Sequence, residues 1–205
     1  MEDAQVETTR FVVGLGNPGR SYRKTRHNVG FEVVAELAKR WDLGRGRRAF
    51  GGRLYDGWAV RGDRRRRAVL LQPHTFMNRS GQAVRQMTAF YKAEAADVLV
   101  VMDDMALPPG RLRTRPGGSP GGHKGLADVM AAMGTNDVPR LRVGIGAPPP
   151  GWDAVDYVLG RFAKDEHETI ERAIRLAADA AEDWILMGIE FAMDQYNRRQ
   201  EPTGN

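Results

Sequence analysis

Hydrophobic residues follow two periods along this chain, one typical of strands and one typical of helices. After a polar start, Phe11, Val12, Val13 and Leu15 form an apolar run that ends in glycine and proline, which predicts a buried strand. From Asn28 to Trp41 the apolar positions recur near helical spacing, and Asn28 is a suitable N-cap. The sequence therefore predicts a strand followed by an amphipathic helix.

The rest of the chain continues this alternation. The pattern predicts a β-hairpin from strands 53–60 and 68–71, a helix over 80–91, a strand over 98–102, an extended segment over 111–115, a Gly/Pro/Ser loop over 116–122, a helix over 124–133, a strand over 140–145, and a long helix from 164 to about 196 with an interruption at Gly188. Alternating strands and helices predict the α/β class.

The length and the pattern fit one domain. The chain has 205 residues, of which 41% are hydrophobic, enough for a single sizeable core. We expect a flexible extension over 1–9, one domain over 10–196 and a tail over 197–205, because no internal repeat or interdomain linker is visible.

Composition narrows the classes of chemistry and partner. The chain has no cysteine, so disulfides, thiolate metal sites and cysteine nucleophiles are excluded. No segment approaches the roughly 20 apolar residues that span a bilayer, and we expect a cytoplasmic protein. The formal net charge is +5, mostly from arginine, which weakly favours a polyanionic partner such as nucleic acid.

Two catalytic motifs match by spacing only. Gly14, Gly16 and Gly19 satisfy G-x-G-x-x-G, but a polar stretch delays the following helix, unlike a dinucleotide-binding turn. Gly117, Ser119 and Gly121 satisfy G-x-S-x-G, but the next residue after the serine is Pro120, which has no N–H for an oxyanion. Neither motif predicts its usual function here.

Polar side chains with catalytic potential follow or flank several predicted strands: Asn17, His27, Asn78, Asp103 and, near the glycine loop, His123. Strand ends converge on one edge of an α/β sheet, where ligands usually bind. A neutral imidazole can take a proton from water, and a carboxylate on its other nitrogen fixes its tautomer. Asp103 can orient His27 in this way, while Asn17 and Asn78 can hold the substrate.

Each of these residues also has a simpler explanation. His27 can be a surface or capping histidine, Asn17 a turn residue, Asn78 a helix cap and Asp103 a solvated strand end. The four histidines lack close-ligand spacing, so no metal is expected. Together the residues indicate a hydrolytic or transfer site.

Six segments, in one collinear order over about residues 10–195, resemble the bacterial-type peptidyl-tRNA hydrolase family. They are Val-Gly-Leu-Gly-Asn-Pro-Gly, Tyr22 with Thr-Arg-His-Asn-Val-Gly, Thr-Phe-Met-Asn-Arg-Ser-Gly, paired acids before Leu-Pro-Pro-Gly, Gly-Gly-His-Lys-Gly-Leu and Arg-Leu-Arg-Val-Gly-Ile-Gly. The resemblance implies a monomeric α/β fold, with a twisted mixed sheet between helices. It implies hydrolysis of the ester in peptidyl-tRNAs released prematurely from ribosomes, which recycles tRNA without a metal or cofactor.

The resemblance also implies roles for individual positions. By motif position, His27 matches the catalytic base and Asp103 its partner acid, whereas Asp104 is the neighbour. Asn17 and Asn78 match residues that engage the peptide and the acceptor end, and Tyr22 and Met77 match residues that line the cleft. Basic positions that clamp a tRNA 5′-phosphate correspond to Arg115 and Arg142, with Arg113 and Arg140 nearby. The arginine run at 64–67 is expected to be an ordinary solvated hairpin, and an auxiliary tRNA contact is the alternative.

Two positions depart from the family pattern. Lys124 stands where an asparagine credited with orienting the attacking water is usual, and Ala106 stands where a second acid is frequent. A charged lysine can donate hydrogen bonds but cannot accept one, so we expect substrate binding at Lys124 with retained hydrolysis and an altered rate or pH profile. The rival interpretation is a non-catalytic RNA-binding relative of the RNA splicing factor type; a nicotinamide-dependent oxidoreductase is the third candidate.

Overall fold

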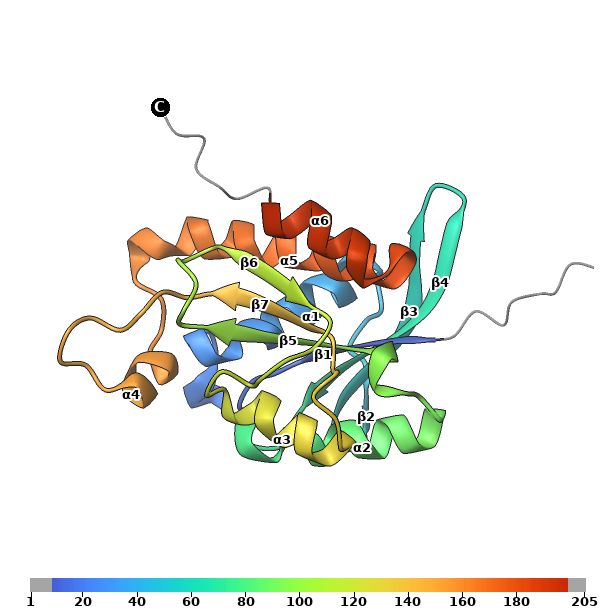
Figure 1. Cartoon of the computed structure of the whole chain (residues 1–205), viewed down its shortest axis with the longest axis horizontal. Coiled ribbons are helices and arrows are strands. Elements are labelled where there is room, and N and C mark those ends of the chain that lie inside the picture. The colour runs from blue at the N-terminus through green and yellow to red at the C-terminus, as the bar shows by residue number, and fades with distance from the viewer. Residues whose placement is uncertain (1–8, 199–205) are drawn as a thin grey trace, which may run out of the picture.

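A seven-stranded mixed sheet forms the centre of the computed structural model, which describes residues 9–198 (Figure 1). Its spatial order is β2-β3-β4-β1-β5-β7-β6. The strands are β1 (Arg10–Gly14), β2 (Arg47–Ala49), β3 (Gly52–Arg61), β4 (Arg64–Pro73), β5 (Val98–Asp104), β6 (Leu112–Arg115) and β7 (Arg140–Gly144). The four central strands β4, β1, β5 and β7 are parallel, whereas β2, β3 and β6 pair antiparallel with their neighbours. The carboxyl ends of the four parallel strands therefore meet at one edge.

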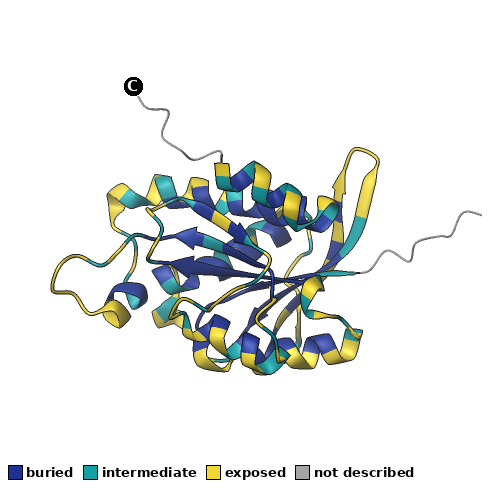
Figure 2. Ribbon diagram, in the orientation of Figure 1, coloured by how far each residue is buried: buried dark blue, intermediate teal, exposed yellow. Residues whose placement is uncertain are grey.

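Helices cover both faces of this sheet. One face packs against α1 (Val29–Arg40), α5 (His167–Met187) and α6 (Ile189–Arg198), and the other against α2 (Ser80–Tyr91) and α3 (Lys124–Met133). The short helix α4 (Ala154–Leu159) lies beside the carboxyl edge. Figure 2 shows the buried residues concentrated on the central strands and on the inner sides of the helices. The predicted α/β class, with helices on both faces, is confirmed.

Most predicted elements are present, with three differences. The hairpin turn is only two residues long, so residues 64–67 belong to β4 and not to a loop. The pattern missed β2 and α4, which have three and six residues. Asn28 stands at the N-cap position of α1, but its side chain makes no capping bond. Short elements carry too few residues to show a period, and a tertiary partner competes for Asn28.

The domain limits are partly outside the described residues. Residues 1–8 and 199–205 are not described, so the predicted extension and tail are left as predictions. Helix α6 continues to Arg198, beyond the expected end of the domain at 196. In the described residues 9–198 no helix has the length and apolar composition needed to cross a membrane.

The arginine run of the hairpin is largely bound within the molecule. Arg66 Nη1 donates to the carbonyl of Ile185 at 3.1 Å, and Arg67 makes a two-point contact with Asp56, at 3.1 and 2.6 Å. Neighbouring Arg61 forms an ion pair with the buried carboxylate of Asp183 in α5. Arg61 and Arg66 therefore fasten the hairpin to α5, whereas the contact of Arg67 with Asp56 joins β4 to β3.

Helix α1 starts in direct backbone contact with the sheet. A Cβ on Gly14 would lie 2.1 Å from the carbonyl oxygen of Gly30, and a Cβ on Gly30 would lie 2.4 Å from that of Val101 and 2.5 Å from the nitrogen of Leu15. Only glycine fits at both positions. Gly14, the first glycine of the rejected dinucleotide motif, therefore serves helix–strand packing.

This contact predicts the effect of Gly30→Ala. We expect the free energy of unfolding to fall by about 3 kcal/mol, because an overpacked core must shift backbone atoms. Gly44→Ala is the control, since a Cβ at this position would meet no atom within 4 Å. The backbone there has a φ of 62°, and this left-handed conformation costs an alanine about 1 kcal/mol. Urea unfolding measures both, and equal losses would contradict the packing argument.

Candidate active site

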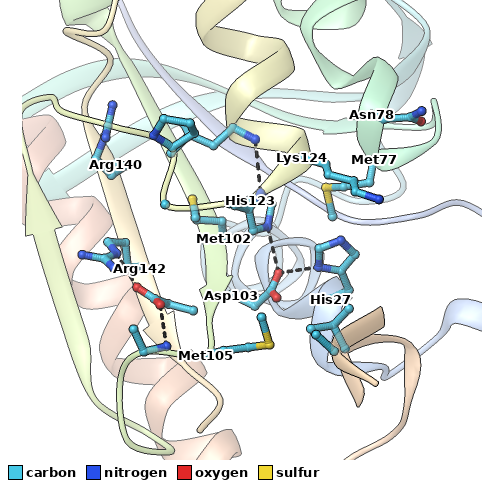
Figure 3. Close-up of a pocket in the computed structure, with 18 of the residues that line it drawn as sticks. His27, Met77, Asn78, Met102, Asp103, Met105, His123, Lys124, Arg140 and Arg142 are labelled. Atoms are coloured by element: carbon cyan, nitrogen blue, oxygen red, sulfur yellow. Dashed lines mark hydrogen bonds and ion pairs between the residues drawn. The ribbon is translucent and has the colours of Figure 1, made fainter. Parts of the chain in front are cut away.

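A cavity of about 860 Å³ opens at the carboxyl edge of the sheet. Residues from seven separate segments of the chain line it, and Figure 3 shows many of them. The lining comprises Asn17, His27, Phe76, Met77, Asn78, Met102, Asp103, Asp104, Met105, Ala106, Arg115, 117–124, Leu126, Arg140, Arg142, Ala154, Val155, Val158 and Leu159. Helix α4, which the sequence pattern missed, forms one wall of the cavity. The side chain of Asp153 caps this helix by accepting the N–H groups of Val155 and Asp156. An aspartate at this position is the sequence signal that could have predicted the start of the helix.

His27 and Asp103 are in direct contact. The imidazole Nδ1 lies 2.8 Å from Asp103 Oδ1, and the Asp103 carboxyl is buried. The residue before His27, Arg26, holds the turn that carries this histidine. The Arg26 side chain is buried and stacks over the ring of Tyr157. Its guanidinium donates to the carbonyl of Arg161 at 2.6 Å and to the carboxylate of Glu166 at 2.8 Å. The chain is thus fixed on both sides of His27, by Arg26 and by helix α1.

A second histidine shares the same carboxylate oxygen. His123 is the N-cap of α3, and its Nδ1 accepts the N–H of Leu126 at 3.2 Å. Because Nδ1 accepts, the ring proton is on Nε2, which lies 3.0 Å from Asp103 Oδ1 and donates to it. The sequence pattern placed His123 only near the glycine loop, because histidine is not among the residues that usually signal an N-cap.

Asp103 is therefore a buried anion held by two donors. Burial opposes its ionisation, but His123 and then His27, through charge and hydrogen bonds, hold the pKa of this carboxyl well below its usual range. An ionised Asp103 accepts the Nδ1–H of His27. The other nitrogen, Nε2, is then left as the proton acceptor of the ring.

The three side chains also have the chemistry of a metal site. One ligand atom from each of His27, Asp103 and His123 lies within 4.8 Å of the others. However, the lone pair of His123 Nδ1 is used by Leu126, so Nε2 carries a proton and has no lone pair for an ion. The arrangement favours a hydrogen-bonded base over a metal centre.

Asn17 ties two loops of the cavity together. Its side-chain Oδ1 accepts the backbone N–H of Met77 at 2.8 Å, and its own backbone is paired with the side chain of Asn28 through bonds of 2.8 and 2.9 Å. The Asn17 Nδ2 group has no hydrogen-bond partner in residues 9–198 and belongs to a residue that lines the cavity. This amide can donate to a substrate oxygen.

The other predicted substrate residues fall into two groups. Met77 is buried, whereas Asn78 and Lys124 are exposed, and all three line the cavity. Tyr22 lies outside the cavity wall, with its ring 6.5 Å from that of Phe76. The structure thus brings Met77, Asn78 and Lys124 to the site, and leaves Tyr22 one side chain away.

Four arginines share one face of β6 and β7. Arg113 pairs with Arg142 and Arg115 with Arg140 across the two strands, so their side chains point the same way. Arg140 is buried and donates to the carbonyls of Gly118, Ser119, Asn136 and Val138. It therefore holds the glycine loop, while Arg115 and Arg142 line the cavity.

These features define a class of protein. An imidazole backed by a buried carboxylate can activate water, and arginines at the rim of the same cavity suit an anionic substrate. The fold and the site fit the class of α/β hydrolytic enzymes.

Comparisons with known proteins give the particular family. A family model described as peptidyl-tRNA hydrolase matches residues 11–203. A peptidyl-tRNA hydrolase of Synechococcus sp. (strain JA-2-3B'a(2-13)) is 47% identical over 189 residues, covering 92% of this chain and 83% of that protein. One from Syntrophomonas wolfei is 44% identical over 191 residues, covering 92% and 100%. The crystal structure of the enzyme from Acinetobacter baumannii matches with a TM-score of 0.84 at 33% identity, covering 94% and 96%. The chain belongs to the peptidyl-tRNA hydrolase family, as its motifs indicated.

Proposed function

We propose that this chain hydrolyses the ester between peptide and tRNA, with His27 as general base and Asp103 as its partner. The observation that carries the proposal is the 2.8 Å contact between His27 Nδ1 and Asp103 Oδ1. It commits Nδ1 to the carboxylate and leaves Nε2 to act on water. The cavity has room for the peptide carbonyl and the terminal ribose beside this nitrogen.

The reaction needs one base and no covalent intermediate. His27 Nε2 takes a proton from water, and the water oxygen attacks the ester carbonyl carbon. Asp103 stabilises the imidazolium that forms. The tetrahedral intermediate then collapses, the bond to the ribose oxygen breaks, and that oxygen receives the proton from His27. The products are free tRNA and a peptide carboxylic acid, which releases its proton to solvent to become a carboxylate.

Two asparagines are assigned to the substrate. Asn17 Nδ2 can donate to the carbonyl oxygen as negative charge develops on it, since its Oδ1 is held by Met77. Asn78 is exposed at the rim, where it can meet the acceptor end. Met77 supplies apolar surface, and Tyr22, which lies outside the cavity wall, supports that wall by packing against Phe76.

Arg115 and Arg142 are assigned to the tRNA 5′-phosphate. They lie on neighbouring strands of the same face and at the same cavity, and a guanidinium fork matches phosphate oxygens. Binding the phosphate fixes the position of the ester relative to His27. Contacts to phosphate and backbone carry no sequence information, so the enzyme accepts different tRNAs.

The proposed substrate also indicates the cellular compartment of the enzyme. Peptidyl-tRNA arises where translation occurs, so we assign the chain to the cytoplasm. We also assign the chain as a monomer, as its resemblance to the family implies. The His123 tautomer supports a mechanism without metal.

A turnover assay tests the proposal directly. Purified protein with EDTA and a peptidyl-tRNA should release free tRNA, whereas His27→Ala should lower kcat at least about 1,000-fold by removing the base. His167→Ala is the matched control, because this exposed histidine contacts only the carbonyl of Phe162 among its described neighbours. Binding of peptidyl-tRNA without release by the wild type would instead establish the RNA-binding alternative.

Lys124 is assigned to the phosphate backbone of the acceptor end. It is exposed at the first turn of α3, lines the cavity, and has no hydrogen bond or ion pair within residues 9–198. An unpaired ammonium at the N-terminus of a helix attracts an anion. We propose that Lys124 contributes a positive charge at a position where the family pattern usually has an asparagine.

Salt dependence measures this contribution. In a plot of log(kcat/KM) against log salt concentration, we expect Lys124→Asn to reduce the slope by about 0.7 to 0.9, the value for one phosphate contact. Lys92→Asn is the control, since Lys92 is exposed at the end of α2 with a φ of 53° that asparagine accepts. Equal slopes for Lys124→Asn and the wild type would refute the assignment.

A further inference from the structure

Two acidic residues end β5 side by side, and the mechanism uses only the first of them. Side chains alternate along a strand, so Asp104 faces the side opposite to Asp103. That side also carries Arg142, which pairs with Met102 across β5 and β7. Both Asp104 and Arg142 line the cavity.

The Asp104 carboxylate is fixed by two partners. Oδ1 accepts the backbone N–H of Ala106 at 2.8 Å, and Oδ2 forms an ion pair with Nε of Arg142 (Figure 3). The Asp104 side chain is only 9% exposed, so this contact is shielded from water and from salt. Ala106 thereby orients the carboxylate, and the carboxylate orients the guanidinium.

The contact leaves the outer end of the guanidinium available. Arginine presents five N–H donors in a rigid fork, and Asp104 takes the donor nearest the stem. Arg142 Nη1 and Nη2 have no hydrogen bond or ion pair in residues 9–198, and the side chain is 27% exposed. These two nitrogens can form a bidentate contact with one phosphate group.

Charge alone does not explain an acid at this place. A carboxylate next to Arg142 repels phosphate and weakens the field of the arginine. A fixed fork, by contrast, loses less rotamer freedom when it binds, and it binds at one angle only. The benefit of Asp104 is therefore geometric.

We propose that Asp104 is a positioning residue for phosphate recognition, which aims Arg142 Nη1 and Nη2 at the tRNA 5′-phosphate and so sets the preference for a phosphorylated tRNA end. This inference rests on the proposed function, in particular on the Arg142 clamp. It assigns the paired acids of β5 to different tasks, Asp103 to the chemistry and Asp104 to recognition.

Substrates with and without the phosphate test the inference. The substrates are peptidyl-RNA acceptor-stem helices that carry either a 5′-phosphate or a 5′-hydroxyl. The phosphate preference is the kcat/KM for the 5′-phosphate substrate divided by that for the 5′-hydroxyl substrate. We expect Asp104→Asn to lower this preference about tenfold, the effect of one misdirected charge-assisted contact. Its kcat on the 5′-hydroxyl substrate should stay within about twofold of the wild type, which also shows that the variant folds. Asp104→Glu, which keeps the carboxylate, should recover part of the preference.

A role of Asp104 in neutralising Arg142 predicts the opposite change in the phosphate preference. If Asp104 only neutralised Arg142, its replacement by asparagine would raise the preference, and that result or an unchanged preference would overturn the inference. Arg142→Ala separates this failure from failure of the clamp. If Arg142→Ala lowers the preference and Asp104→Asn does not, only the positioning role is wrong; if neither lowers it, the clamp and the inference are both wrong. The double variant should lose no more preference than Arg142→Ala alone.

Discussion

The first turn of α1 lies against the ends of β1 and β5 with no side chain between them. Gly14 and Gly30 make this approach possible, because a Cβ on either one would overlap backbone atoms. His27 lies two residues before the start of the helix, and Asp103 lies near the end of β5. The distance between base and acid is therefore set by a backbone contact, which is stiffer than any side-chain contact. Arg26 completes the constraint from the other side by binding Arg161 and Glu166.

Asp103 is the residue through which this rigid arrangement supports the reaction. Its Oδ1 accepts from His27 on one side and from His123 on the other, so three distant segments of the chain meet at one oxygen. Two donors keep the carboxyl ionised in spite of burial. Because side chains alternate along β5, the next acid faces the arginines of β7. One strand end thus supports both proton transfer and binding of an anion.

The sequence allowed much of this arrangement to be predicted, for identifiable reasons. Long elements with a clear period, such as the helices at 80–91 and 124–133, were predicted with their observed bounds. His27 and Asp103 were named from motif position, and the structure places them in contact. Local spacing could not show that His123 shares the carboxylate of Asp103, since 20 residues separate them. Nor could it show that the Asn28 side chain binds Asn17 instead of capping α1, because tertiary hydrogen bonds outcompete local ones.

The tautomers of the two histidines test the central claim most directly, since the base is defined by which nitrogen lacks a proton. Nitrogen-15 NMR of the ring nitrogens, with His27→Gln and His123→Gln for assignment, distinguishes them. At a pH where both rings are neutral, the account predicts a proton on Nδ1 of His27 and on Nε2 of His123, so the two rings should be opposite tautomers. A proton on Nε2 of His27 would contradict it, because that nitrogen could not then take a proton from water.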